Sequence, residues 1–191
     1  MSHAHSMRLL VLGLGNVLCG DDGVGPAVVA ELGRRYVPPE GACVMDGGTL
    51  GLTLLPLLAD AEHVLLVDAV LTGDVPGTLV RLRGDDVTPA VRSRLSVHQV
   101  GVADLLDGLR LCGHWPRRLG LVGVVPASFE LHLGRSQAIE RAVPALVEAV
   151  VEEAARWGHV FAPKGPKAPR EDDETATAAL GVDHGRRALE L

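Results

Sequence analysis

The stretch LLVLGLGNVLCGDDGVG, residues 9–25, decides the first unit of the fold. An apolar run of strand length leads into a glycine-rich turn, which is typical of a strand-to-helix unit in α/β proteins. The turn departs from the dinucleotide-binding fingerprint G-x-G-x-x-G, because Leu18 stands where the third glycine would allow close helix–strand packing. Asp21 and Asp22 also stand where a helix N-terminus would receive a phosphate, and they would repel it. The loop therefore favours a cation over an anion.

Strand-length apolar runs alternate with helical patterns along the rest of the chain. We expect strands over residues 8–13, 42–48, 62–70, 77–86 and 117–125, and helices over 24–36, 50–61, 96–113 and 136–157. Pro144 lies inside the last helix and is expected to kink or restart it. This alternation predicts an α/β fold, a three-layer αβα arrangement around a largely parallel central sheet of about five strands.

The length of 191 residues fits one domain with a sizeable core. We expect a flexible N-terminus over residues 1–7, an α/β domain over 8–161, and a disordered tail over 162–191. The tail is rich in proline and mixed charge and has little apolar periodicity, so it cannot bury enough apolar surface to offset the cost of ordering.

Charge and hydropathy exclude several classes of partner. The net charge of -6 argues against nucleic acid or an anionic membrane. No apolar stretch reaches the roughly 18 residues of a membrane span, and the start MSHAHSMR lacks the apolar middle of a signal peptide. We therefore expect a cytoplasmic protein without membrane insertion, and nothing in the sequence demands more than a monomer.

Three side chains with metal-binding chemistry follow predicted strands or precede a predicted helix. Asp22 closes the first strand-to-helix loop, Asp68 ends the apolar run VLLVD, and His98 precedes a helix that begins near Gln99. In open α/β sheets, the loops at the carboxyl ends of neighbouring strands converge on one crevice. Two carboxylates and one imidazole that meet there would form a metal site. The sequence therefore predicts Asp22, Asp68 and His98 as metal ligands.

Each of these three residues also has a purely structural explanation. Asp22 can cap the following helix, Asp68 can start a turn, and His98 can form a hydrogen bond at the start of its helix. The structural explanation is weakest for Asp68, because a carboxylate directly after an apolar strand is desolvated and needs a partner.

Three further loop residues carry chemistry of their own. Asp46, in MDGGT, is expected to hold its turn through backbone hydrogen bonds. His132, in PASFELHLGRS, follows the fifth predicted strand and could reach the crevice, although a structural or solvated role is favoured. Cys19 could act as a nucleophile, but acids stand beside it, where a reactive thiol needs a histidine or lysine.

Five motifs in order carry a resemblance to a known family, namely GLGNVLCGDDGVG, MDGGTLG, LLVDAV, SVHQVGVADLL and LVGVVPASFELHLG. They resemble the hydrogenase maturation endopeptidases, and the similarity spans about Arg8 to Trp157. The resemblance implies that Asp22, Asp68 and His98 bind the metal, with Asp22 at a position where some relatives have glutamate.

The resemblance also implies a reaction and a partner. Family members remove a short C-terminal extension from the large-subunit precursor of nickel-iron hydrogenases after nickel insertion, with nickel as the recognition signal. Three ligands without sulfur should hold a metal weakly, so nickel delivered by the substrate and a site that is empty at rest are expected. Two alternatives remain, a non-enzymatic nickel checkpoint protein or chaperone that uses the same ligands, and a nucleotide-binding enzyme, which Leu18 and the two acids disfavour.

Overall fold

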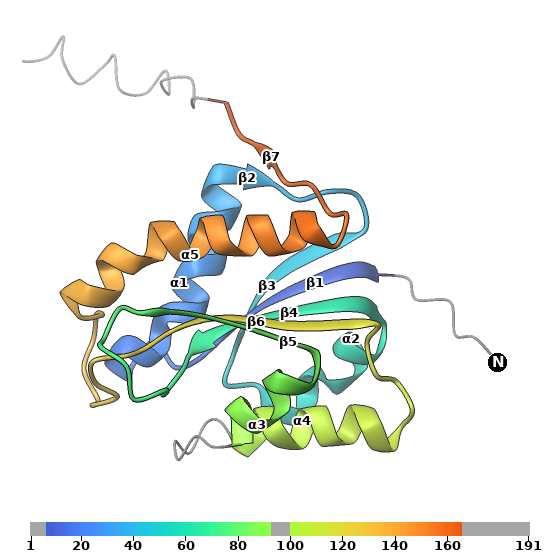
Figure 1. The fold of residues 1–191 in the computed structure, drawn as a ribbon, viewed down its shortest axis with the longest axis horizontal. Helices are drawn as coiled ribbons and strands as arrows, with labels where there is room; N and C mark the ends of the chain where they lie inside the picture. Colours follow the sequence, from blue (N-terminus) through green and yellow to red (C-terminus); the bar gives the residue numbers. More distant parts are fainter. Residues whose placement is uncertain (1–6, 93–99, 166–191) are drawn as a thin grey trace, which may run out of the picture.

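The computed structural model describes residues 7–92 and 100–165, which form a central sheet with helices on both faces (Figure 1). The sheet strands are β1 (Met7–Leu14), β3 (Ala42–Gly48), β4 (Ala61–Ala69), β5 (Leu79–Arg83) and β6 (Arg118–Val124). The helices are α1 (Val24–Arg35), α2 (Leu55–Ala59), α3 (Val87–Arg92), α4 (Val100–Leu111) and α5 (Gln137–Arg156). The 3-10 turns are η1 (Gly20–Gly23), η2 (Gly51–Leu54) and η3 (Gly84–Asp86).

The sheet has the order β3-β1-β4-β6-β5. Neighbours pair in parallel from β3 to β6, and β5 joins as an antiparallel edge strand. The predicted three-layer fold with a largely parallel sheet is confirmed. Because β3, β1, β4 and β6 run in the same direction, the loops that follow them all lie at one edge of the sheet, which we call the carboxyl edge. No helix in the described part of the chain is long and apolar enough to cross a bilayer.

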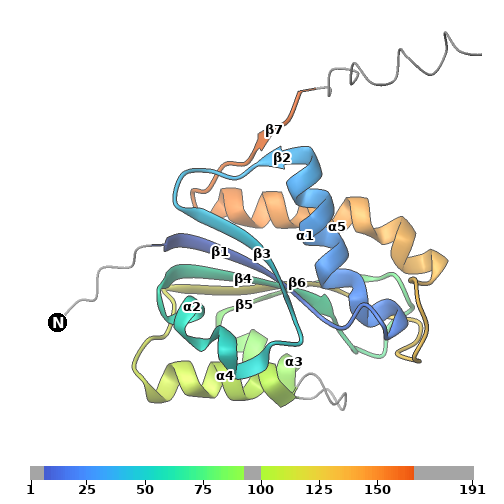
Figure 2. The ribbon, with the colours of Figure 1, turned by 180° about the vertical axis from the view of Figure 1, so that it is seen from behind.

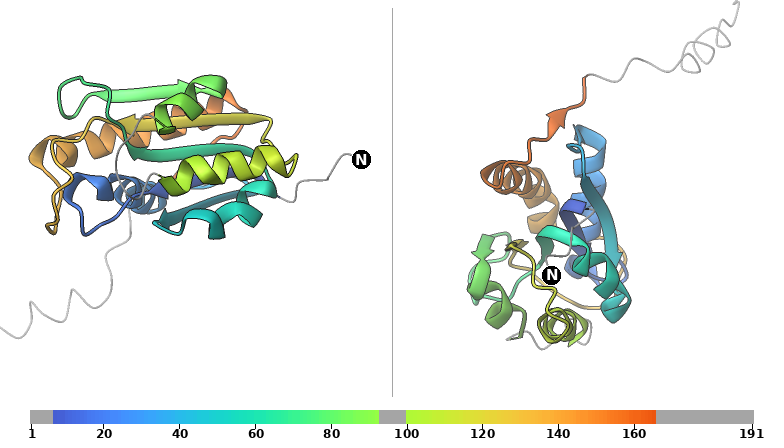
Figure 3. Two further views of the ribbon diagram at one scale, coloured as in Figure 1. Left: turned by 90° about the horizontal axis from the view of Figure 1, so that it is seen from below. Right: turned by 90° about the vertical axis from the view of Figure 1, so that its right-hand side faces the viewer.

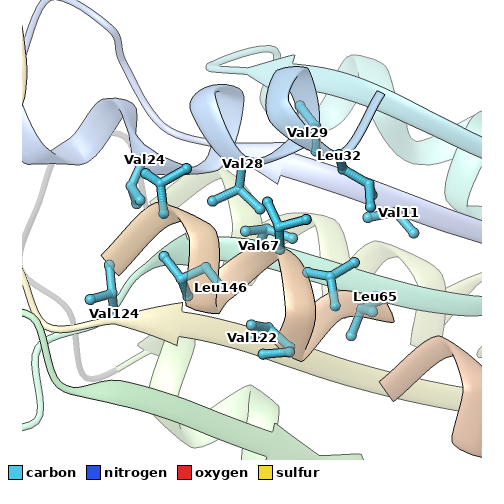
Figure 4. Close-up of a cluster of buried hydrophobic side chains, with 14 of the residues drawn as sticks. Val11, Val24, Val28, Val29, Leu32, Leu65, Val67, Val122, Val124 and Leu146 are labelled. Carbon is cyan, nitrogen blue, oxygen red and sulfur yellow. The ribbon is translucent and has the colours of Figure 1, made fainter. Parts of the chain in front are cut away.

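Both faces of the sheet are buried, which explains the continuous apolar runs. Leu9 and Val11 of β1 face the core under α1 and α5, whereas Leu10 and Leu12 face the core under α2, α3 and α4. The two helical layers lie on opposite sides of the sheet (Figures 2 and 3). Figure 4 shows the first core, where valines and leucines of α1, α5 and the strands interdigitate. This packing fixes the strand ends, and therefore the carboxyl edge.

Helix α5 runs as one segment from Gln137 to Arg156, with Pro144 inside it. The expectation that this proline restarts the helix is wrong. Val143, Leu146 and Val147 of α5 are buried in the core shared with α1, and this burial offsets the backbone hydrogen bond that proline cannot donate.

The domain extends past its expected end at residue 161. Strand β7 (Ala162–Pro163) pairs antiparallel with β2 (Tyr36–Val37), and the backbone N–H of Lys164 donates to the carbonyl of Arg35 at 2.8 Å. The expected tail boundary at 162 is therefore too early, because this short ribbon gives the segment backbone partners. Residues 1–6 and 166–191 lie outside the described residues.

Two truncations should separate the ribbon from the residues beyond it. A chain ending at Gly165 should melt within about 2 °C of the full chain, because the composition of residues 166–191 predicts little apolar burial. A chain ending at Phe161 should melt lower, since it loses the pairing with β2. Thermal unfolding followed by circular dichroism gives both values. A drop of several degrees on removing only residues 166–191 would show that they pack on the domain.

A histidine pair lies at the edge of the sheet opposite the carboxyl edge, near the start of β4. His63 of β4 contacts His159, which follows α5, with 2.8 Å between Nδ1 and Nε2. Burial lowers the pKa of His63, and the neighbouring His159 lowers it further. Burial also lowers the pKa of His159. The folded protein therefore resists protonation of both rings.

This pair predicts a loss of stability in mild acid. In the unfolded chain both histidines titrate near about 6.5, above their folded pKa values, so the unfolded state takes up protons first as the pH falls. The free energy of unfolding should be constant above about pH 6.5 and should decrease as the pH falls below that value. Urea unfolding between pH 7.5 and 5.5 measures this decrease. His63→Gln should reduce this decrease, and an equal decrease in the wild type and in His63→Gln would contradict the assignment.

Candidate active site at the carboxyl edge

The loop after β1 folds back tightly and places two acids in the protein interior. Gly15 has φ of 124°, and a Cβ there would lie 1.8 Å from the carbonyl oxygen of Asp22. Only glycine fits at this point, so the glycine-rich sequence serves a close backbone approach. The chain then enters η1, in which Asp21 and Asp22 are both about 1% exposed.

Asp21 is fully satisfied by backbone donors from the loop between β6 and α5. Its Oδ2 accepts from the N–H of Ala127 at 2.7 Å and of Ser128 at 3.3 Å. Its Oδ1 accepts from the N–H of Ser136, the N-cap residue of α5, at 2.6 Å. This carboxylate therefore ties η1 to the loop of residues 125–136, which we call the β6–α5 loop. Its role is structural, and the sequence analysis did not assign it.

Asp22 has a different environment from its neighbour. Its Oδ2 accepts from the N–H of Asn16 at 2.7 Å, whereas its Oδ1 is buried without a hydrogen-bond partner in the described part of the chain. The N-cap of α1 is Gly23, with no side-chain capping bond, so the capping explanation for Asp22 is wrong. A buried carboxylate oxygen without a partner is costly unless a cation or donor arrives.

Asp68 is the second-last residue of strand β4, next to the carboxyl edge, and is 3% exposed. Its Oδ1 accepts from the N–H of Ala69 at 2.8 Å. Strand β4 contacts η1, and α1 approaches so closely that a Cβ on Gly25 would lie 2.5 Å from the carbonyl oxygen of Val67. The structure thus places Asp22 and Asp68 at the same edge, as the sequence predicts.

The third predicted ligand, His98, lies outside the described residues. Within residues 7–92 and 100–165, no three His, Cys, Asp or Glu side chains form a group that could hold a metal ion. The described residues therefore contain two of the three predicted ligands, and the ligand set stays a prediction.

Asp46 holds its turn, as expected, because its Oδ1 accepts from the N–H of Gly48 at 2.8 Å. It also lines a hollow of about 150 Å³ at the ends of β1 and β3, together with Gly15 and Asn16. Sequence reasoning missed this hollow, because it forms between two loops about 30 positions apart.

His132 is exposed and contacts η1 through its backbone. The N–H of Gly20 donates to the carbonyl of His132 at 3.1 Å, and a parallel bridge pairs Cys19 with His132. Its Nδ1 lies 3.2 Å from the carbonyl oxygen of Leu133. The β6–α5 loop therefore does reach the carboxyl edge, with its backbone against the loop that carries Asp22.

The comparisons with known proteins agree with this geometry. The family model for hydrogenase maturation protease, HycI, matches residues 26–153. The chain belongs to the hydrogenase maturation protease family. Hydrogenase 2 maturation protease of Escherichia coli strain K12 is 39% identical over 146 residues, covering 76% of this chain and 89% of the relative. HupD of Rhodobacter capsulatus is 35% identical over 184 residues, covering 94% of this chain and 86% of the relative.

Solved structures of hydrogenase maturation proteases share the fold. HybD of Escherichia coli superposes with a TM-score of 0.79 at 37% identity, covering 83% of this chain and 98% of that structure. HybD of Thermococcus kodakarensis gives a TM-score of 0.64 at 27% identity, covering 78% of this chain and 99% of that structure. As a member of this protease family, the protein is a hydrolase that cleaves peptide bonds.

Proposed function

We propose that this protein is a cytoplasmic, monomeric endopeptidase that removes the C-terminal extension from the large-subunit precursor of a nickel-iron hydrogenase after nickel insertion. The substrate's nickel would be recognised by Asp22, Asp68 and His98. The proposal is supported by membership of the hydrogenase maturation protease family. The observation that carries its metal part is the buried Oδ1 of Asp22, which has no hydrogen-bond partner within residues 7–92 and 100–165.

The donor set fits a metal that arrives with the substrate. Asp22 keeps one carboxylate oxygen fixed by Asn16, which orients the other oxygen without satisfying it. Two carboxylates and one imidazole leave coordination positions for ligands from the precursor, and the absence of sulfur from the set favours weak binding. The protein's residues would orient the metal-bearing precursor so that the scissile peptide lies at the carboxyl edge. Bound there, nickel would supply Lewis acidity, either to the scissile carbonyl or to an attacking water.

Mass spectrometry of a processing reaction tests the proposal. Purified protein is mixed with nickel-loaded precursor and, in parallel, with nickel-free precursor. We expect the loaded precursor to lose its extension and the nickel-free precursor to stay intact. An uncut loaded precursor that still binds the protein would support the alternative, a nickel checkpoint protein or chaperone. Equal cutting of both precursors would contradict recognition through nickel.

A thiol nucleophile near Asp22 would be Cys19, which lies in the same loop. Cys19 is half-buried, and its backbone pairs with His132. Cys19→Ser keeps the size of the side chain and should process the precursor within about twofold of the wild-type rate, because the chemistry is assigned to the metal. Loss of processing by this variant, with precursor binding intact, would indicate a thiol nucleophile.

A further inference from the structure

Exposed apolar side chains gather at the carboxyl edge. Most of the large apolar side chains that are exposed among residues 7–92 and 100–165 lie in loops that follow β1, β3, β4 and β6. Four of them occupy two neighbouring loops, Val17 and Leu18 before η1, and Leu131 and Leu133 in the β6–α5 loop. Leu131 and Leu133 are 80% and 81% exposed. We call these four residues the apolar lip.

The two halves of the lip are held together by their backbones. The bridge between Cys19 and His132 places Leu18 beside the segment that carries Leu131 and Leu133. Gly20, with φ of 56°, lets the loops approach so closely that a Cβ there would lie 2.7 Å from Nε2 of His132. The two loops lie side by side in three views of the molecule (Figures 1, 2 and 3).

Asp21 anchors the β6–α5 half of the apolar lip to η1. Its three hydrogen bonds to the N–H groups of Ala127, Ser128 and Ser136 bracket the segment that carries Leu131 and Leu133. The protein thus carries the exposed leucines on a loop that Asp21 anchors on both sides of them. Such preorganisation lowers the entropic cost of binding. Exposed apolar side chains that cluster beside an active site mark an interaction surface.

We infer that the apolar lip docks against an apolar recess on the folded body of the precursor, next to its extension. This inference rests on the proposed function. Leu131 and Leu133 are exposed by about four-fifths, and exposed apolar area of this kind forms the well-packed core of interfaces between folded proteins. The lip is continuous with the site, because Leu18 lies four residues before Asp22 in the same loop. Docking there would place the extension beside the two carboxylates.

The test compares two double variants, each of which replaces two exposed apolar side chains by serine. Leu131→Ser with Leu133→Ser changes the lip, and Leu111→Ser with Val160→Ser changes exposed apolar residues away from the carboxyl edge. All four positions are at least 70% exposed, so both proteins should melt like the wild type. The lip variant should raise the KM for nickel-loaded precursor roughly tenfold and keep kcat within about twofold, since buried anchors carry most of the energy of an interface. The control variant should leave both values unchanged.

A direct binding measurement distinguishes the effect of the apolar lip on affinity from any effect on cleavage. Biolayer interferometry with immobilised precursor measures Kd even if no cutting occurs, so failure of the proposed function and failure of the lip give different results. We expect a roughly tenfold weaker Kd for the lip variant, and no difference between lip variant and wild type toward a synthetic peptide of the extension. An unchanged Kd for the precursor would overturn the inference. Equal weakening toward the peptide would assign the lip to the extension and would also overturn it.

Discussion

Asp22→Asn should give a folded protein that no longer processes nickel-loaded precursor. The amide can keep the bond to the N–H of Asn16, while the position of the unpartnered Oδ1 loses its negative charge. Because Oδ1 has no hydrogen-bond partner among the described residues, neutralising this buried carboxylate should leave the melting temperature equal to or above that of the wild type. Asp68→Asn and His98→Ala should also abolish processing, with losses of at least about 100-fold in kcat/KM. Mass spectrometry of the precursor and calorimetric titration with nickel give the two readouts.

The three variants must fail together if they share one metal. The decisive combination is normal melting, lost nickel affinity and uncut precursor in all three proteins. If His98→Ala still cuts at the wild-type rate, with nickel confirmed in the precursor, then the third ligand has been assigned to the wrong histidine.

Asp21→Ala should have the opposite profile, with a large loss of stability. The substitution removes the acceptor for the backbone N–H groups of Ala127, Ser128 and Ser136. Charge-assisted bonds of this kind suggest a loss of about 3 kcal/mol in the free energy of unfolding. That corresponds to a melting temperature lower by roughly 6–12 °C for a domain of this size. Urea unfolding and thermal melting measure both quantities.

The neighbouring aspartates are matched controls for each other. Asp21→Asn should also destabilise, since its amide N–H₂ would face backbone donors, whereas Asp22→Asn should not. If Asp21→Asn melts like the wild type, its carboxylate does not hold the β6–α5 loop. If instead Asp22→Asn melts much lower, the buried Oδ1 has a partner that supports the fold.

The fold was largely predictable because its elements follow local patterns. Burial on both faces makes β1 and β4 continuous apolar runs, and helices cover both sides with the expected period. The end of the domain was less predictable. Ala162 and Pro163 join it through backbone pairing with β2, more than 120 positions earlier, and such pairing leaves no pattern in side-chain type.

The site was predictable only in part. Asp22 and Asp68 could be placed together, because strand ends of a parallel sheet share one edge. The different roles of Asp21 and Asp22 could not be predicted, since the two acids are adjacent and alike. What separates them is a set of N–H donors more than 100 residues away, which only the folded chain brings into reach. The apolar lip could not be predicted either, because it is formed by two loops that are far apart in the sequence.

The strand order also determines when this edge can form during synthesis on the ribosome. Strand β5 is made before β6, yet in the sheet it pairs only with β6, so it waits for a partner that emerges more than 30 residues later. The donors for Asp21 come later still, at residues 127–136. A nascent chain that has emerged only as far as β4 already contains both aspartates but lacks the loop that anchors them. The carboxyl edge that carries both aspartates is therefore completed among the last parts of the domain, after most of the chain has left the ribosome.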